Sequence, residues 1–319
     1  MKKNILVTGG AGFIGSNLVS AFLKDKRIDK VRVLDNLATS SIVNIEEFMD
    51  NPRFAFIEGD IRDYATCLKA SEGMNLISHQ AAMGSVPRSI NDPLTTNAVN
   101  ITGTLNVFTA AKENKIERIV YAASSSTYGD NTDLPKLEDN IGKPLSPYAV
   151  TKYVNELYAH VYGSLYGLEH IGLRYFNVFG PNQSPDGAYA AVIPLFMQAV
   201  LTGLPPTING DGSISRDFSY VGNAVQANLL ALFTENTEGV NQVYNVACGE
   251  RTTLHKLFSM IKNIAQSHIE PIYGPNRVGD IQHSLADISK IQQKLGYQVQ
   301  IPMDKCLALT FEWYKKNAS

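Results

Sequence analysis

The first half of the chain alternates short apolar runs with longer stretches in which apolar residues recur every three or four positions. The short runs predict β-strands at residues 4–8, 31–35, 54–58, 76–79, 118–123 and 170–174. Several are apolar almost throughout, as is typical of strands buried on both faces of a sheet. The longer stretches predict helices, most clearly at residues 13–24, 93–113 and 147–166. This alternation predicts an α/β fold built on a doubly wound parallel sheet with right-handed crossovers.

The pattern changes after about residue 177, where proline and glycine become frequent and the apolar runs shorten. We expect a smaller C-terminal lobe there, with a last helix at residues 303–315. Within residues 220–246, a helix followed by a strand at 243–246 is expected to return to the first lobe. The predicted division assigns residues 1–176 and 217–247 to the sheet domain, and residues 177–216 and 248–319 to the smaller lobe.

Composition narrows the class of protein. The chain has 319 residues, of which 44% are hydrophobic and 18% charged, and its formal net charge is −2, as in ordinary globular proteins. No run of Lys and Arg predicts a nucleic-acid or membrane surface, and no stretch approaches the ~18 apolar residues of a membrane-spanning helix. The apolar run at residues 5–7 is too short for a signal peptide and predicts a strand entering a loop. Cys67, Cys248 and Cys306 lack metal-ligand spacing, so we expect reduced thiols in a cytoplasmic protein and no metal site.

A glycine-rich segment follows the first predicted strand and opens the first predicted helix. It reads Gly10-Ala11-Gly12-Phe13-Ile14-Gly15 and matches the dinucleotide fingerprint G-x-G-x-x-G in the context that this fingerprint requires. Gly9 adds a second spacing with Gly12 and Gly15. Such glycines allow a tight turn and a close approach of the backbone to a pyrophosphate, and the helix N-terminus offers free N–H groups. The first lobe is therefore expected to be a Rossmann-type dinucleotide-binding domain.

Residues at the ends of the next strands indicate which dinucleotide binds. Asp35 ends the second strand, where a carboxylate can accept both ribose hydroxyls of an adenosine and would repel the 2′-phosphate of NADP, so NAD is favoured. Asp60 follows the third strand and either lies at the adenine edge or caps a helix or turn. Gln80-Ala81-Ala82 follows the fourth strand and is expected along the pyrophosphate and second ribose. Further cofactor contacts are expected from Phe13, Ile14, Asn36, Ile61 and Asn100.

A tyrosine and a lysine carry the candidate chemistry. Tyr148 and Lys152 are four residues apart on one predicted helix, so they share a face one turn apart. A tyrosine has a pKa near ~10 and is a weak base, but a neighbouring ammonium and an oxidised nicotinamide favour its phenolate. The pair can then act as general base and acid toward a carbinol. This pattern predicts reversible alcohol–ketone chemistry.

A serine run ends the fifth predicted strand, where parallel sheets bind their ligands. Ser124 is expected to hydrogen-bond the reacting hydroxyl and help to move its proton. Ser125 and Ser126 are expected to hold other groups of the substrate, although Ser126 also fits a solvated turn.

Together these motifs resemble the extended short-chain dehydrogenases/reductases of the sugar-nucleotide branch, over essentially the whole chain. The segments that carry the resemblance are TGGAGFIG, SSSTYG, SPYAVTK and LRYFNVFGP. The resemblance implies that Ser124, Tyr148 and Lys152 are catalytic. It also implies that Tyr175 lies near the nicotinamide, and that Asn177 lies at the sugar diphosphate.

Within this branch the chain is most similar to the UDP-N-acetylglucosamine/UDP-N-acetylgalactosamine 4-epimerase family. The similarity rests on residues 84–89, which include Ser85 and Arg88, and on residues 187–192, which include Ala191 and Val192. It implies that Arg216 and Arg277 grip the UDP phosphates, a task that suits the guanidinium fork, and that Asn209 and Asp280 contact uridine or ribose. It implies a UDP-sugar substrate and a homodimer through helices 93–113 and 147–166. The pathway served stays open, although supply of glycan or surface-polysaccharide precursors would be sensible.

One position bears on the size of the sugar. Epimerases limited to UDP-glucose and UDP-galactose wall the sugar pocket with a tyrosine, and Ser284 takes that position here in the alignment. A small residue leaves room for an N-acetyl group. A slip of one residue would place His283 there instead.

Several other functions compete with a 4-epimerase. A 4,6-dehydratase needs a carboxylic acid beside the catalytic serine, and no Asp or Glu follows Ser124 until Asp130. A UDP-glucuronate 4-epimerase or decarboxylase needs a cation for the substrate carboxylate, and Arg88 could supply it. A reductase that releases NADPH is disfavoured by Asp35. A protein that binds NAD only to sense it has no need of Tyr148 and Lys152 together. The balance between acetylated and non-acetylated sugars stays open at this level.

Overall fold

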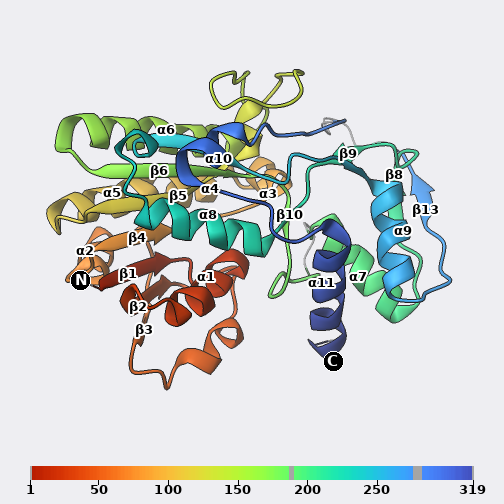
Figure 1. Cartoon of the computed structure of the whole chain (residues 1–319), viewed down its shortest axis with the longest axis horizontal. Helices are drawn as coiled ribbons and strands as arrows, with labels where there is room; N and C mark the ends of the chain where they lie inside the picture. Colours follow the sequence, from red (N-terminus) through yellow and green to blue (C-terminus); the bar gives the residue numbers. More distant parts are fainter. Residues whose placement is uncertain (1, 187–189, 276–281, 318–319) are drawn as a thin grey trace.

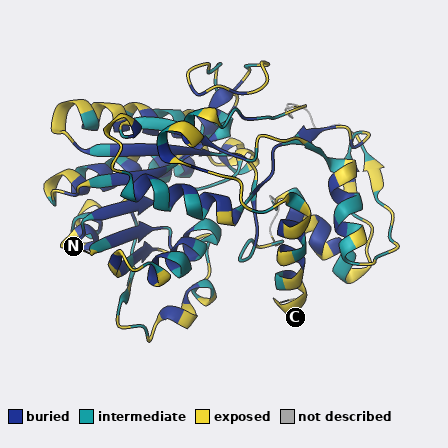
Figure 2. Cartoon of the chain, in the orientation of Figure 1, coloured by how far each residue is buried: buried dark blue, intermediate teal, exposed yellow. Residues whose placement is uncertain are grey.

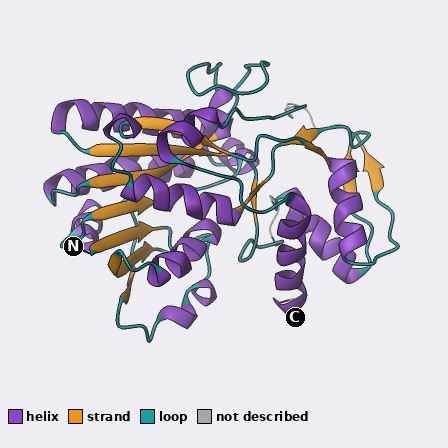
Figure 3. Ribbon diagram, viewed as in Figure 1, coloured by secondary structure: helices purple, strands orange, loops and turns teal. Residues whose placement is uncertain are grey.

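A parallel sheet forms the centre of the molecule. The computed structural model describes residues 2–186, 190–275 and 282–317. In this part of the chain, seven parallel strands form the main sheet in the order β11-β6-β5-β4-β1-β2-β3. The strands are β1 Lys3–Thr8, β2 Ile28–Asp35, β3 Phe54–Glu58, β4 Leu76–His79, β5 Arg118–Ser124, β6 Glu169–Tyr175 and β11 Gln242–Val246. The predicted Rossmann-type sheet is confirmed, and Figures 1 and 3 show helices on both of its faces.

Helices cover the sheet because each has one apolar side. On one face lie α1 (Phe13–Lys24) and α8 (Val221–Phe233), which contribute Leu18, Phe22 and Ala227 to a core with the strands. On the other lie α2 (Tyr64–Ser71), α5 (Thr104–Glu113) and α6 (Pro147–Tyr166), whose core includes Phe108 and Tyr162. Figure 2 shows the strands buried between exposed outer helix faces. Burial on both sides explains why these strands are apolar almost throughout.

The predicted helix at residues 93–113 is interrupted in its middle. The chain forms α4 (Pro93–Asn97), a π-helical segment at Ala98–Gly103, and then α5, after a short α3 (Val86–Asn91) that the pattern did not predict. In the π-helical segment the fully buried Asn100 bonds both backbone polar groups of Met83 through its side chain. A π-helical turn inserted in an α-helix is frequent at functional sites.

A smaller lobe follows β6 and packs around its own core of aromatic and aliphatic side chains. Its helices are α7 (Val192–Thr202), α9 (Leu254–Ile264) and α11 (Met303–Asn317), with α10 (Ser289–Leu295) lying against β11. Short strand pairs complete it: β10 (Ser219–Tyr220) with β7 (Val178–Phe179), β12 (Thr252–Thr253) with β9 (Ser215–Arg216), and β13 (Ile272–Gly274) with β8 (Thr207–Asn209). Because β11 joins β6, the chain enters this lobe and then returns to the main sheet. The predicted boundaries between the two parts stay a prediction.

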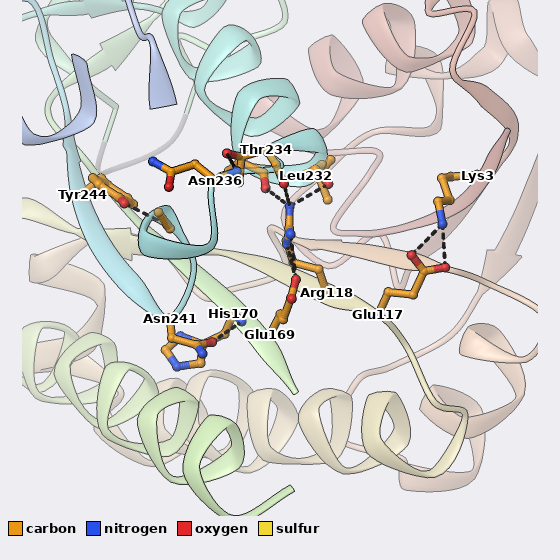
Figure 4. A network of polar contacts seen from close by, with 12 residues as sticks. Lys3, Glu117, Arg118, Glu169, His170, Leu232, Thr234, Asn236, Asn241 and Tyr244 are labelled. Atoms are coloured by element: carbon orange, nitrogen blue, oxygen red, sulfur yellow. Dashed lines mark hydrogen bonds and ion pairs between the residues drawn. The ribbon is translucent and has the colours of Figure 1, made fainter. Parts of the chain in front are cut away.

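The amino ends of the strands are held by a polar network far from the carboxyl ends (Figure 4). Arg118 begins β5, pairs with Glu169 at 2.6 Å, and donates to the carbonyls of Ala231, Leu232 and Thr234 at the end of α8. A cation at these carbonyls satisfies groups that a helix C-terminus leaves without partners. The network therefore fixes α8 against the sheet.

Two smaller predictions can be compared with the structure. Cys67 and Cys306 are buried, Cys248 is partly buried, and all three are free thiols. Among the described residues, no helix is long and apolar enough to cross a membrane.

Candidate active site

A cavity of about 620 Å³ opens at the carboxyl ends of the strands. It is lined by the loop after β1, the ends of β2 to β6, the N-terminal part of α6 and the segment before α7. The predicted site residues that line it are Gly9, Gly12, Phe13, Ile14, Gly15, Asp35, Asn36, Asp60, Ile61, Gln80, Ala81, Ala82, Ser85, Arg88, Ser124, Tyr148, Lys152, Tyr175, Asn177 and Ala191. Parallel strands bring these residues together because their carboxyl ends meet at one edge.

The glycine loop fits a pyrophosphate. Gly9 has φ of +70°, and a Cβ there would lie 2.6 Å from the backbone nitrogen of Ala81. A Cβ on Gly15 would lie 2.1 Å from the carbonyl oxygen of Gly9, so only glycine lets α1 start this close to the loop. Helix α1 begins after Gly12 without a side-chain cap or an acidic residue in its first turn. Its first N–H groups and its dipole therefore face the cavity ready for an anion.

Asp35 is fixed at the position expected for the adenosine ribose. Its carboxylate accepts hydrogen bonds from the Ala11 and Leu37 nitrogens at 3.0 and 2.9 Å and from the Ser40 hydroxyl at 2.8 Å. Ser40 also lines the cavity, and the sequence analysis missed it because it follows no motif. Three donors on one carboxylate hold it in a single orientation, which suits the binding of a diol.

Asp60 is paired within the protein. Hydrogen bonds from the Arg62 side chain, helped by Asn36, lower the pKa of Asp60 to about 2. Asp60 lines the cavity, and its carboxylate also accepts from the Arg62 backbone, as a turn-capping residue would. Asp60 therefore caps a turn at the cavity wall, and its contact with adenine stays a prediction.

A buried amide network supports the middle of the cavity. Asn228, on α8, donates to the Tyr175 hydroxyl at 2.7 Å and accepts from the Gln80 amide at 3.2 Å. Tyr175 in turn donates to the Gln80 Oε1 at 3.2 Å. Burial raises the pKa of Tyr175 to about 12, so its hydroxyl stays protonated. Asn228 was not predicted, because its role depends on how α8 packs and not on a motif.

The Tyr148–Lys152 pair lies at the start of α6. Ser146 caps the helix by accepting from the Ala149 nitrogen, Pro147 occupies its first turn, and Ser89 accepts from the Tyr148 nitrogen at 3.1 Å. The Lys152 ammonium donates to the Ala122 carbonyl at 2.9 Å and lies 5.9 Å from the centre of the Tyr148 ring. The sequence thus builds a rigid helix start at the cavity wall.

Burial acts on both titrating groups. It lowers the pKa of Lys152 to about 8, because the charged form is desolvated. It raises the pKa of Tyr148, and a hydrogen bond with the Ser124 side chain opposes that rise. The Ser124 hydroxyl also accepts from the Ser126 nitrogen and hydroxyl at 3.2 and 2.9 Å. Ser124, Tyr148 and Lys152 therefore form one proton-handling cluster at the cavity wall.

Other predicted site residues in the described part of the chain do not line the cavity. Ser125 and Ser126 lie in the 3₁₀ turn after β5, and Asn100 is buried behind Met83. Val192 begins α7, Asn209 ends β8, and Arg216 lies on β9, where it donates to the Ser215 and Gln282 carbonyls. Ser284 Oγ lies 3.5 Å from the Asn177 Nδ2. Arg277, Asp280 and residues 187–189 lie outside the described residues.

Among the described residues, no group of three His, Cys, Asp or Glu side chains could hold a metal ion. The chemistry present is that of hydroxyls, an ammonium, amides and a glycine-rich helix start.

Comparisons with known proteins agree on one group of enzymes. Residues 5–247 match the model of the NAD dependent epimerase/dehydratase family. The UDP-glucose 4-epimerase of Mycolicibacterium smegmatis is 35% identical over 98% of this chain and 99% of that protein. The UDP-N-acetylglucosamine 4-epimerase of Methanobrevibacter ruminantium, solved with UDP-N-acetylmuramic acid, is 39% identical with a TM-score of 0.94 over 99% of this chain and 100% of the other. The UDP-glucuronic acid 4-epimerase of Bacillus cereus, solved with UDP-glucuronic acid and NAD, is 30% identical with a TM-score of 0.91, over 98% and 99%.

Proposed function

The chain belongs to the NAD dependent epimerase/dehydratase family, and from that premise we propose that it interconverts UDP-N-acetylglucosamine and UDP-N-acetylgalactosamine at C4 with an NAD that stays bound through the cycle. The broader activity, NAD-dependent 4-epimerisation of a UDP-sugar, is that of its relatives. The acetylated sugar and the retained cofactor are the parts proposed here.

The position of Ser284 carries the choice of sugar. Its hydroxyl lies 3.5 Å from the amide nitrogen of Asn177, which lines the cavity. The neighbouring His283 instead contacts Ser215, with 2.8 Å between the His283 Nδ1 and the Ser215 hydroxyl. A serine side chain is far smaller than the tyrosine that walls the pocket in epimerases limited to glucose and galactose. On this proposal the 2-acetamido group of the sugar lies beside Asn177. The similarity to the Methanobrevibacter ruminantium enzyme supports the same choice.

The residues of the cavity divide the chemistry between them. NAD held by the glycine loop and Asp35 would supply the hydride acceptor and donor for C4 of the sugar. Tyr148 as phenolate takes the proton of the 4-hydroxyl and later returns one, acting as base and then as acid. Ser124 bridges Tyr148 and the hydroxyl, and Lys152 stabilises the phenolate by its charge. Between the two transfers the 4-keto sugar turns over about its diphosphate linkage.

The glycine loop, Asp35 and the amide network explain why NAD would stay. On this proposal the N-terminus of α1 would hold the phosphates, and Asp35, whose carboxylate is already fixed by three donors, would hold the ribose diol. Such preorganisation reduces the ordering cost of binding. The cycle regenerates the cofactor, so release is not needed for turnover.

UDP-glucuronate is a second candidate substrate, favoured by one observation. Arg88 lines the cavity, and a guanidinium could pair with the C6 carboxylate. The Bacillus cereus relative acts on that sugar. In this structure the Arg88 guanidinium lies 3.1 Å from the Met83 sulfur.

The outer face of α6 supports a homodimer. Val150, Leu157, Val161 and Leu165 follow one another at helical spacing on this face and are exposed, Leu165 to 69%. Ile90 on α3 and Leu94 on α4, which pack beside α6, extend the apolar surface. We propose that a second copy of the chain covers this apolar α6 face, since an extended exposed apolar surface marks an interaction site.

The test is turnover of purified protein without added NAD, with UDP-N-acetylglucosamine, UDP-glucose and UDP-glucuronate supplied separately and products separated by chromatography. We expect UDP-N-acetylgalactosamine to form fastest. A preference for UDP-glucose or UDP-glucuronate would refute the acetylated sugar, and activity that depends on added NAD would refute the retained cofactor.

Replacing Ser284 with tyrosine tests the wall directly. We expect S284Y to lower kcat/KM for UDP-N-acetylglucosamine by about 10- to 200-fold, because a pocket contact of this kind discriminates between substrates on that scale. The kcat/KM for UDP-glucose should stay nearly unchanged. Ser213→Tyr, which adds the same ring on an exposed turn, is the matched control. Equal losses for both sugars in S284Y would contradict the assignment.

A further inference from the structure

A strap of chain, residues 282–287, carries Ser284 between the two lobes. Its first half pairs with β9: the Ser215 nitrogen donates to the Gln282 carbonyl at 3.1 Å, and the Ser284 nitrogen donates to the Ser215 carbonyl at 3.1 Å. Its second half pairs with Lys136, whose nitrogen donates to the Leu285 carbonyl at 2.8 Å and whose carbonyl accepts from Asp287 at 3.0 Å. The strap changes partner directly after Ser284. The side-chain position of Ser284 thus depends on how the strap is held on both sides.

Asn245, in β11, is the side chain that fixes the second half of the strap. Its amide nitrogen donates to the carbonyls of Lys136 and Asp287 at 2.9 and 3.0 Å. Its backbone nitrogen donates to the Glu138 carboxylate at 2.9 Å. Asn245 is fully buried, so no water replaces these bonds. One amide therefore joins the main sheet, the 131–138 loop and the strap.

The same amide reaches the serine turn. Its oxygen accepts a hydrogen bond of 2.6 Å from the Tyr128 hydroxyl. Tyr128 ends the 3₁₀ turn Ser125–Tyr128 that directly follows Ser124, and it is buried against Phe176 and Ala286. Tyr128 belongs to the SSSTYG segment, yet nothing in the proposed chemistry uses it. Through Asn245, this tyrosine links the turn beside Ser124 to the strap that carries Ser284.

We propose that Asn245 is a positioning residue for sugar selectivity, which sets the distance between the wall at Ser284 and the proton-handling cluster at Ser124 and Tyr148. This inference rests on the proposed function, because it gives Ser284 a place beside the 2-substituent of the sugar. An amide suits this position because it has both donors and an acceptor. Its nitrogen donates to the Lys136 and Asp287 carbonyls, and its oxygen accepts from the Tyr128 hydroxyl. Aspartate would set a carboxylate against both carbonyls, and an aliphatic side chain would remove one hydrogen bond from each of the Lys136 carbonyl, the Asp287 carbonyl and the Tyr128 hydroxyl.

A second anchor acts on the strap from the other side. The buried carboxylate of Asp217 accepts from the nitrogens of Cys248 at 2.8 Å, Gly249 at 3.0 Å and Ala286 at 3.3 Å, while its backbone carbonyl accepts from the Asn177 amide. Asn177 is therefore held by the residue that also holds the strap. With Asp217 in place, loss of the Asn245 bonds shifts the strap without releasing it.

The experiment compares Asn245→Ala and Tyr128→Phe with the wild type. Tyr128→Phe removes the 2.6 Å hydrogen bond to Asn245, together with the hydrogen bond between the hydroxyl and Arg174, and keeps the ring, so it tests the link even where Asn245→Ala fails to fold. The readout is the ratio of kcat/KM for UDP-N-acetylglucosamine to that for UDP-glucose, measured with thermal unfolding and bound-NAD content. We expect the ratio to fall about tenfold in Asn245→Ala and severalfold in Tyr128→Phe, with NAD retained.

Arg118→Ala is the matched control. Arg118 joins elements at the opposite edge of the sheet (Figure 4), so its loss should lower the melting temperature and leave the selectivity ratio unchanged. If Asn245 only stabilised the fold, Asn245→Ala would also lower the melting temperature and leave the selectivity ratio unchanged. An unchanged ratio in both Asn245→Ala and Tyr128→Phe would therefore overturn the proposal. The wild-type ratio alone decides the proposed substrate, so the two ideas can fail separately.

Discussion

At the scale of single residues, the site combines Lys152 and Tyr148, whose pKa values burial shifts in opposite directions. Burial makes Lys152 easier to deprotonate and Tyr148 harder to ionise. Each charge opposes the effect of burial on the pKa of the other group, because an ammonium beside a phenolate favours both charged forms.

Lys152→Met is expected to move the acid limb of the kcat/KM profile about one to three pH units higher. The sign follows from charge: without the ammonium the pKa of Tyr148 rises, so the phenolate forms only at higher pH. The measurement is kcat/KM against pH with the preferred UDP-sugar. Lys143→Met, the same change at an exposed position, should leave the profile unmoved. An unmoved acid limb in Lys152→Met would show that Tyr148 does not depend on this charge.

Which residues of the site could be predicted follows from how each reaches it. Asp35 and Ser124 end parallel strands, so their place at the cavity follows from the strand pattern alone. Asn228 reaches Gln80, and Asn245 reaches Tyr128, across more than a hundred residues of sequence through tertiary hydrogen bonds. No local period or motif encodes such contacts, so they became visible only in the folded chain.

At the scale of elements, the loop between β1 and α1 shows how a helix start becomes a phosphate site. The close contact of Gly15 with the Gly9 carbonyl brings the first turn of α1 against the loop. The same scale shows the limit of periodicity. Apolar spacing predicted one helix at residues 93–113, but the buried Asn100 lies in a π-helical segment that a count of apolar positions does not distinguish from an α-helix.

Gly15→Ala is expected to destabilise the protein by about 1–3 kcal/mol, the usual cost of forcing an extra carbon into a packed site. It should also lower the bound-NAD content, because α1 must move away from the loop. Thermal unfolding and the nucleotide released on denaturation measure the two effects. Ser20→Ala, on the same helix, is the control. A Gly15→Ala protein with normal melting temperature and full NAD would contradict the close approach.

At the scale of the whole molecule, two lobes share one cavity while the apolar α6 face points away from it. Leu157 and Leu165 are exposed on that face, to 50% and 69%, and neither lines the cavity. Assembly and catalysis can therefore be changed separately.

The double variant Leu157→Glu/Leu165→Glu is expected to be monomeric, because charges placed in an apolar interface must be desolvated without partners. Light scattering after size exclusion gives the mass. Leu204→Glu, a similar change at an exposed leucine in the smaller lobe, should keep the wild-type mass. A wild-type protein that is already monomeric, or a double variant that still dimerises, would exclude this face as the interface.

The return of the chain to β11 has a consequence for synthesis on the ribosome. Gln242 pairs with Ile171, so β6 remains an open sheet edge until the intervening smaller-lobe segment has been made. Unpaired edges invite pairing with other chains, and pairings between distant residues form slowly. A nascent chain that has emerged only as far as α7 exposes this edge, and this stage of synthesis is where a chaperone would matter most.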